Sequence, residues 1–192
     1  MAKLYFRYGT MGSSKSANAL MTRFNYLERG YRVMLMKPAV DVREGRSVVR
    51  SRIGLEAPAE LLAAGETVRQ HFGAPPPQVI ILDEAQFATE KQIEELRDLA
   101  DGEDIPVFCY GLRTDFRTRL FPGSRRLFEL ADSVYELKSV CDCGRKAIVN
   151  ARYADGRVVC EGEQVAIGGN EMYRGLCYRC WKRALKESET CM

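Results

Sequence analysis

The sequence has little of several features that mark particular classes of protein. It contains one histidine, His71, which lies in no motif, so mechanisms that depend on a histidine base or nucleophile are not expected. No uninterrupted apolar run is long enough to span a bilayer, and no apolar stretch follows the basic start, so neither a membrane span nor a secretory signal is predicted. These absences predict a cytoplasmic protein without a membrane partner.

The chain also lacks a large excess of charge of either sign. The chain has 29 Lys and Arg against 26 Asp and Glu, a formal net charge of +3, and its basic residues are scattered. No stripe that could follow a phosphate backbone is present, so a polynucleotide is not the expected partner. With 46% hydrophobic and 29% charged residues, the 192-residue chain is expected to fold into one domain of ordinary size and a small appendage.

Short continuous apolar runs alternate with helical patterns through most of the chain. Continuous apolar strands indicate a sheet that is covered on both faces, and their alternation with helices indicates a largely parallel α/β sheet. Residues 41–57 are rich in Arg and Glu, are long for a plain connection, and are predicted to form a mobile loop. The predicted strands are residues 4–8, 33–36, 79–82, 107–110 and 134–137.

The texture of the sequence changes beyond residue 138. Cysteines come in pairs, residues 149–153 alternate in polarity, and Asp155-Gly156 is a turn signal, which together indicate a hairpin held by a metal. We therefore predict an α/β nucleotide-binding domain over residues 1–137 and a small metal-containing domain over residues 138–192.

Four of the seven cysteines form two close pairs, Cys141 with Cys143 and Cys177 with Cys180. Thiolates that ligate Zn²⁺ commonly come as two such pairs on separate loops, although the first pair is one residue closer than most. A Zn²⁺ ion with four sulfur ligands is structural, and it would staple a lobe that is too small to be stable through its own core. Two pairs of free thiols are the alternative.

The segment 9–16 fits the phosphate-binding pattern GxxxxGK[ST] except that Ser14 replaces the second glycine. In such a loop backbone N–H groups surround the phosphates, the lysine reaches the β and γ oxygens, and the last hydroxyl holds Mg²⁺. The segment follows a predicted strand and opens an amphipathic helix, which favours a phosphate loop over a surface turn. A serine at a backbone position suited to glycine is strained, which destabilises the folded chain by about 1 kcal/mol. The predicted nucleotide-binding residues here are Gly9, Thr10, Met11, Gly12, Ser13, Ser14, Lys15 and Ser16.

Two adjacent acids, Asp83 and Glu84, follow the predicted strand 79–82. The carboxyl end of a parallel strand is where such sheets bind ligands, so Asp83 is predicted to hold Mg²⁺ opposite Ser16. Glu84 could accept a proton from the nucleophile in phosphoryl transfer. Acids are also common where a strand leads into a helix. The phosphate loop makes the catalytic interpretation the favoured one, with either water or a small molecule as the acceptor.

Five blocks of sequence occur in a fixed order over nearly the whole chain. They are the phosphate loop with Met11 inside it, Asp-Glu-Ala-Gln-Phe at 83–87, Tyr-Gly-Leu-Arg-Thr-Asp-Phe at 110–116, Phe-Pro-Gly-Ser at 121–124, and Ile-Gly-Gly-Asn-Glu-Met-Tyr at 167–173. These blocks and their order resemble the type II thymidine kinases. The resemblance implies transfer of the γ-phosphate of ATP to the 5′-hydroxyl of thymidine, with deoxyuridine as a second substrate, in nucleotide salvage. It also implies Mg²⁺ with ATP and a structural Zn²⁺.

The resemblance also implies roles for individual residues. Glu84 would be the base, with Lys15 and Arg43 as the other catalytic groups. Asp41 would join Asp83 at the phosphates and metal, and a lasso of backbone around residues 165–171 would bind the base. Ala85 and Gln86 complete the expected ATP and metal site. The expected thymine-binding residues are Met11, Phe87, Leu112, Phe116, Phe121, Gly168 and Tyr173.

The family is commonly homotetrameric and inhibited by dTTP, so both properties are expectations here. Two other functions stay open at this level. A P-loop ATPase with a zinc ribbon would consume ATP without a nucleoside. A zinc-ribbon module that binds nucleic acid would show a steep salt dependence of polynucleotide binding, but it leaves Lys15 and Asp83 unexplained.

Overall fold

The protein was analysed as a computed structural model, which describes residues 1–40, 47–165 and 172–188. Its centre is a six-stranded parallel sheet in the order β5-β2-β6-β7-β1-β8. All five predicted strands are present, so the predicted α/β class is confirmed. The strands are β1 (Leu4–Tyr8), β2 (Val33–Pro38), β5 (Glu60–Leu62), β6 (Val79–Leu82), β7 (Val107–Gly111) and β8 (Ser133–Glu136).

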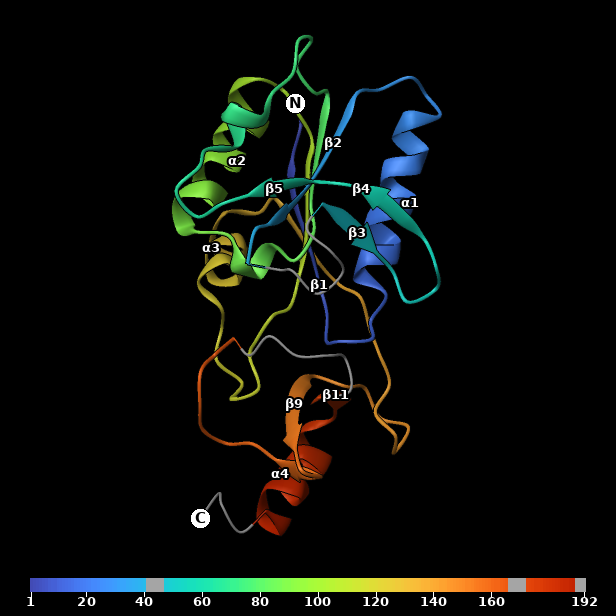
Figure 1. Ribbon diagram of the computed structural model, residues 1–192, viewed down its shortest axis with the longest axis vertical. Coiled ribbons are helices and arrows are strands. Elements are labelled where there is room, and N and C mark those ends of the chain that lie inside the picture. The colour runs from blue at the N-terminus through green and yellow to red at the C-terminus, as the bar shows by residue number, and fades with distance from the viewer. Residues whose placement is uncertain (41–46, 166–171, 189–192) are drawn as a thin grey trace.

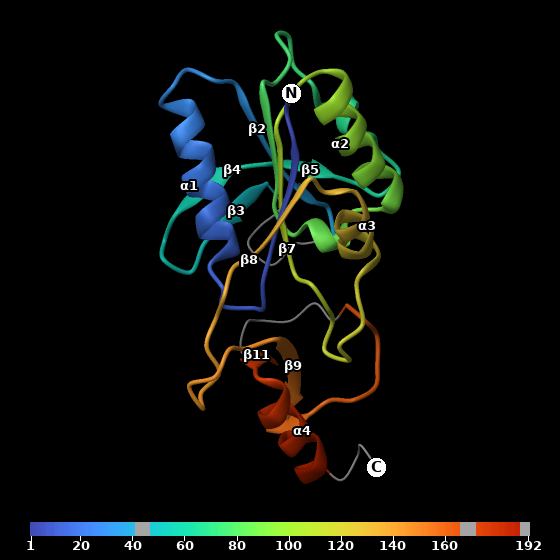
Figure 2. The ribbon, with the colours of Figure 1, turned by 180° about the vertical axis from the view of Figure 1, so that it is seen from behind.

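Helices cover both faces of this sheet, as the continuous apolar strands predict. Helix α1 (Lys15–Leu27) lies on one face, and α2 (Glu90–Gly102) and α3 (Pro122–Leu130) lie on the other (Figures 1 and 2). Short 3₁₀ turns occur at Val68–His71 (η1) and Ala85–Phe87 (η2). The connections between parallel strands therefore pass over the sheet, and the loops after β1 and β6 meet at its carboxyl edge.

Two apolar clusters form the core, one on each side of the sheet. Strand β6 is completely buried, and its alternate residues serve the two sides. Ile80 and Leu82 pack beneath α2, whereas Val79 and Ile81 pack beneath α1. Because β6 is buried on both faces, it fixes the position of the residues that follow it, Asp83 and Glu84.

The segment 41–57, predicted to be a mobile loop, contains regular structure in its described part, residues 47–57, and its mobility stays a prediction. Strands β3 (Val48–Arg50) and β4 (Glu56–Pro58) form an antiparallel hairpin that packs against α1. Val49 and Ala57 are buried in the α1-side core. The inward apolar residues are few and lie among charged ones, so their alternation did not stand out in the sequence.

The C-terminal elements form a separate lobe beyond the carboxyl ends of the sheet strands (Figure 1). Strands β9 (Val149–Ala154), β10 (Arg157–Val158) and β11 (Tyr173–Leu176) make an antiparallel sheet, and α4 (Tyr178–Glu187) packs on it. We call these elements, with the preceding segment 139–148, the cysteine lobe. The β9–β10 hairpin confirms the turn predicted at Asp155-Gly156, whereas the division into two domains at residue 137 stays a prediction.

Within the described part of the chain, no helix combines the length and the apolar character needed to cross a membrane.

Candidate active site

The loop after β1 has the backbone conformation of a phosphate-binding loop. Gly9 is confined, since a Cβ atom there would lie 2.3 Å from the Ser13 Oγ and 2.4 Å from the Leu137 carbonyl oxygen. Gly12 and Ser14 both have positive φ angles, +83° and +59°. Ser14 therefore occupies a left-handed position, as the comparison with the glycine pattern predicted, at a cost of about 1 kcal/mol.

Lys15 begins α1, and its side chain folds back over the loop. Its Nζ atom donates a hydrogen bond of 2.8 Å to the Thr10 carbonyl oxygen and lies 3.5 Å from the Ser13 Oγ. The residue is only 8% exposed. The ammonium group is thus held at the mouth of the loop, where the phosphates of a nucleotide would lie.

Asp83 lies at the end of β6 and is 3% exposed. Burial, and next the neighbouring Glu84 carboxylate, raise the pKa of Asp83 to about 7, although hydrogen bonds from the Ser16 hydroxyl and the Glu84 N–H oppose this. Its Oδ1 atom is buried and has no hydrogen-bond partner within residues 1–40, 47–165 and 172–188. A buried carboxylate oxygen without a partner, next to a serine hydroxyl, fits the oxygen-rich site that Mg²⁺ prefers.

Glu84 follows in a left-handed conformation, with φ 50° and ψ 36°. A residue other than glycine is strained there, and strain of this kind is concentrated at functional sites. The Gln86 side chain supports the carboxylate. Its Nε2 donates to Glu84 Oε2 at 2.5 Å, and its Oε1 accepts from the Leu112 N–H at 2.9 Å.

Ala85 and Gln86, both expected at the nucleotide, are buried in η2 beneath the cavity and do not line it. The Gln86 side chain contacts Glu84 and the Leu112 N–H, and the roles of Ala85 and Gln86 at the nucleotide stay predictions.

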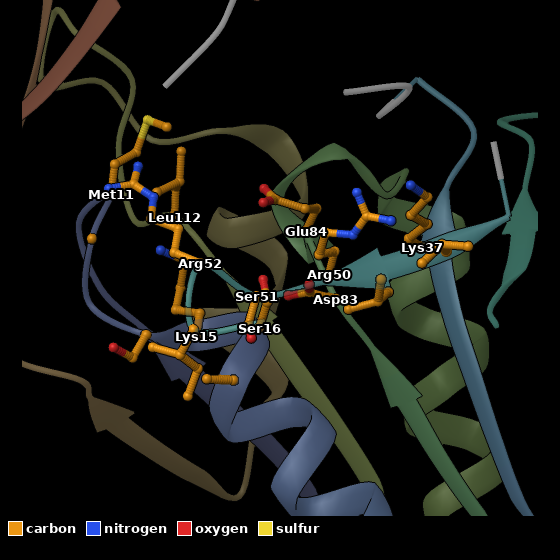
Figure 3. A pocket seen from close by; sticks show the side chains of 16 residues that line it. Met11, Lys15, Ser16, Lys37, Arg50, Ser51, Arg52, Asp83, Glu84 and Leu112 are labelled. Carbon is orange, nitrogen blue, oxygen red and sulfur yellow. The ribbon is translucent and has the colours of Figure 1, made fainter. Parts of the chain in front are cut away.

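One cavity joins the phosphate loop, the acid pair and an apolar end (Figure 3). Lys15, Ser16 and Asp83 form its floor, the Glu84 carboxylate points into it, and Met11 lies at one end beside Leu112. Sequence reasoning did not find the contribution of the β3–β4 hairpin, because its residues belong to no motif and were expected to be mobile. The lining residues from the hairpin are Val48, Val49, Arg50, Ser51, Arg52 and Ile53.

The aromatic residues expected at the base, Phe87, Phe116, Phe121 and Tyr173, do not line the phosphate cavity. Phe87 and Phe121 meet edge to face at 5.6 Å. Phe116 is 2% exposed beneath the Arg152 guanidinium, which lies 3.9 Å from the ring centre. Arg152 Nε also donates to the Tyr173 hydroxyl at 2.9 Å. Asp41, Arg43 and Gly168 lie outside the described residues.

Asn150 on β9 connects the cysteine lobe to the phosphate loop. Its Oδ1 accepts a hydrogen bond from the Met11 N–H, and its Nδ2 donates to the Thr114 carbonyl, both at 2.8 Å. Because one partner can only donate and the other can only accept, the amide has a single allowed orientation. Gly175 on β11 lies close to the loop as well, since a Cβ atom there would be 3.3 Å from the Met11 carbonyl oxygen. Sequence reasoning did not single out Asn150 because it lies in no motif.

Two buried charged residues hold the segment that leads toward residues 166–171. Arg152 donates to the carbonyl groups of Glu163 and Gln164, at 2.9 and 3.1 Å. Asp115 accepts from the Gln164 side chain at 3.0 Å and from two backbone N–H groups of its own loop. The loop after β7 and the cysteine lobe are therefore joined by polar contacts as well as by packing.

The four paired cysteines converge, as their spacing predicts. Their sulfur atoms all lie within 4.8 Å of one another, and Cys143 Sγ is 3.6 Å from Cys177 Sγ. Tetrahedral Zn²⁺ with Zn–S bonds of about 2.3 Å places its ligands about 3.8 Å apart. Cys177 also accepts a hydrogen bond from the Cys180 N–H at 3.5 Å, which lowers the pKa of its thiol to about 7. The cluster could hold a metal ion.

A parallel sheet with a phosphate loop after one strand and an acid pair after another defines a P-loop nucleotide-binding enzyme. The family model described as thymidine kinase matches residues 2–181. A thymidine kinase of Novosphingobium aromaticivorans is 47% identical over 190 residues, 96% of this chain and 99% of that protein. The thymidine kinase of Yersinia pseudotuberculosis is 46% identical, over 97% of this chain and 97% of that protein. That of Ruegeria pomeroyi is 45% identical, over 96% of this chain and 96% of that protein. The chain belongs to the thymidine kinase family.

Proposed function

We propose that this chain transfers the γ-phosphate of ATP to the 5′-hydroxyl of thymidine, producing dTMP and ADP. One observation carries the proposal. A single cavity contains the phosphate-loop residues Lys15 and Ser16, the acid pair Asp83-Glu84 and an apolar end, so a donor phosphate and an acceptor hydroxyl can meet in it. Membership in the thymidine kinase family supports thymidine as the acceptor.

The phosphate loop and Asp83 would bind the nucleotide. Lys15 would exchange its contact with the Thr10 carbonyl for oxygens of the β- and γ-phosphates, which are stronger acceptors for an ammonium group. Ser16 and Asp83 would hold Mg²⁺. When bound, this ion neutralises charge on the phosphates. Asp41 and Arg43, expected from the resemblance to join this site, remain part of the proposal.

Glu84 would be the general base. Its carboxylate accepts the proton of the 5′-hydroxyl while that oxygen forms a bond to Pγ, and the bond from Pγ to the bridging oxygen breaks, so that ADP leaves with the electron pair. Gln86 would keep the carboxylate aimed into the cavity through its paired contacts with Glu84 and the Leu112 N–H.

Thymine would bind at the apolar end of the site. Met11 and Leu112 line the cavity there, and Phe87, Phe116, Phe121, Gly168 and Tyr173 are the further residues that the resemblance assigns to the base. The thymine methyl group contributes only about 1–3 kcal/mol of discrimination. Deoxyuridine is therefore expected to react, but less well than thymidine.

A panel of nucleosides tests the function. The purified chain with MgATP is given thymidine, deoxyuridine, deoxycytidine or uridine, and both the nucleoside monophosphate and ADP are quantified. We expect thymidine to be best, deoxyuridine second, and one ADP for each monophosphate. ATP consumption without any nucleoside would instead identify an ATPase, and polynucleotide binding with a steep salt dependence would identify a nucleic-acid module.

The metal of the cysteine lobe would be structural Zn²⁺. Four sulfur ligands leave no position for substrate, and the lobe buries only a small apolar cluster of its own. The ion would therefore hold the lobe together and take no part in the chemistry.

We further infer a homotetramer in the cytoplasm that is inhibited by dTTP, as the family resemblance implies. Helix α1 supports an oligomer, since Met21, Phe24 and Leu27 are 53%, 57% and 39% exposed on its surface. Exposed apolar groups that adjoin one another commonly mark an interface. Sedimentation analysis tests the assembly, and competition between dTTP and thymidine tests the inhibition.

A further inference from the structure

The β3–β4 hairpin presents an arginine directly to the phosphate loop. Arg52 lines the cavity with Lys15, Ser16 and Asp83, and its Nη1 lies 3.8 Å from the point that a Cβ atom on Gly12 would occupy. In Figure 3 it lies between Lys15 and the apolar end formed by Met11 and Leu112. An arginine fork at this place faces the space above the loop.

The backbone that carries Arg52 is well supported. Ser51 is 7% exposed, its Oγ accepts from the Leu55 N–H at 3.0 Å, and its own N–H donates to the Leu55 carbonyl at 2.8 Å. Val49, two residues before Ser51 in β3, is buried in the core beneath α1. The backbone at Arg52 is therefore held close to α1, the helix that begins at Lys15.

The two arginines of the hairpin differ in their contacts. Arg50 donates through Nε to Glu56 Oε2 at 2.8 Å, so its charge is already paired within the hairpin. Arg52 is exposed, and among the described residues it has no hydrogen bond or ion pair. An exposed guanidinium over a phosphate loop has all its donors available for a planar oxyanion, which Arg binds in a bidentate manner.

We propose that Arg52 is a phosphate-binding residue that contacts the terminal phosphate of ATP and neutralises charge during transfer. Lys15 and Asp83 mark the position of the β- and γ-phosphates, and Met11 with Leu112 marks the acceptor side, so a group between them meets the phosphate that is transferred. The proposal rests on the proposed function. It gives Arg52, in the β3–β4 hairpin, a role that no sequence motif indicates.

Binding of MgATP and MgADP to the purified chain, measured by titration calorimetry without a nucleoside, tests the proposal. Arg52→Ala is expected to weaken ATP binding by about 10- to 100-fold, the range of one or two charge-assisted hydrogen bonds. ADP, which lacks the contacted phosphate, should lose much less. Arg52→Lys should recover part of the ATP affinity, since it restores the charge but not the fork.

Two controls separate a direct contact from a general effect of charge. Arg29→Ala removes an exposed arginine beyond the far end of α1, whose Nη1 donates to the Asn25 carbonyl at 2.9 Å, and it should leave ATP binding unchanged. Arg50→Ala removes the same charge from the same hairpin, and it should cost less than Arg52→Ala. Thermal unfolding of each apo variant should match that of the unaltered chain.

Three results would each overturn the assignment of Arg52 while leaving the proposed kinase function intact. Arg52→Ala could weaken the binding of ATP and ADP equally, or leave the ATP affinity unchanged. Arg50→Ala could weaken ATP binding as much as Arg52→Ala does. Failure of the unaltered chain to bind ATP would overturn both. In steady-state assays, support requires that Arg52→Ala raise the KM for ATP and lower kcat, with little change in the KM for thymidine.

Discussion

The six-stranded sheet and the cysteine lobe are held together by different means. The sheet buries large apolar clusters on both faces, so hydrophobic burial stabilises it throughout. The lobe buries few apolar side chains around Trp181, and two of its buried residues are the cysteines Cys141 and Cys177. The comparison shows that packing alone can hold the sheet and the loops that follow its strands, whereas the lobe has a small core beside four cysteines that could hold a metal ion.

The chemistry belongs to the sheet region, and Glu84→Gln should have the largest effect of any single change. The amide cannot accept the proton, so turnover of thymidine should fall by about 10²- to 10⁴-fold while ATP affinity changes little. Initial rates and nucleotide titration measure the two quantities. The control Glu187→Gln alters an exposed residue of α4 and should keep full activity. Unchanged turnover in Glu84→Gln would refute the assignment of the base.

The cysteine lobe can be disturbed by itself through its sulfur cluster. Cys177→Ser should release a bound metal, loosen the lobe and weaken thymidine binding before ATP binding, because Tyr173, which is expected at the base, lies in the lobe itself. Metal content by mass spectrometry and separate titrations with the two substrates measure these effects. Cys109→Ala is a matched control, since Cys109 is a buried thiol of β7 and its loss should leave the metal bound. Equal loss of both substrates in Cys177→Ser would mean that the two regions are not separable.

Asn150 is where the two regions can be uncoupled. Asn150→Asp keeps an acceptor for the Met11 N–H but places a charge against the Thr114 carbonyl, so the free energy of unfolding should fall by about 1–3 kcal/mol. The affinity for ATP should fall as well, because the Met11 N–H that Asn150 holds belongs to the phosphate loop. Denaturant unfolding and ATP titration measure the two effects. Asn25→Asp, at an exposed position of α1, should change neither, and an unaltered stability of Asn150→Asp would contradict the assigned contacts.

The smallest effect is expected from Asp83→Asn, which should change how the stability of the Mg²⁺-free protein depends on pH. Its pKa is raised to about 7 in the folded chain, so the folded state binds more protons and stability falls as pH rises from about 4 to about 7. Asp83→Asn removes this loss and should raise the melting temperature at pH 8 by about 2–4 °C, with a smaller difference near pH 4. Melting curves at the two pH values measure it, and a pH-independent difference would contradict the assigned burial effect.

The sequence predicted most of the sheet because its strands are short, continuously apolar and separated by helical patterns. It also predicted the phosphate loop, the strained Ser14, the place of Asp83 and the convergence of the four cysteines. Each of these depends on neighbours in the chain or on a spacing that has a chemical meaning. Local patterns of this kind can be recognised in the sequence without knowledge of the fold.

Only the tertiary structure decided which distant residues complete the site. Arg52 reaches the phosphate loop because the β3–β4 hairpin packs on α1, and Asn150 reaches Met11 because the cysteine lobe lies over the carboxyl edge of the sheet. Likewise, only the fold shows that the Gln86 side chain contacts both Glu84 and the Leu112 N–H. Contacts between residues far apart in the chain leave no periodicity or spacing in the sequence, so the fold alone determines them.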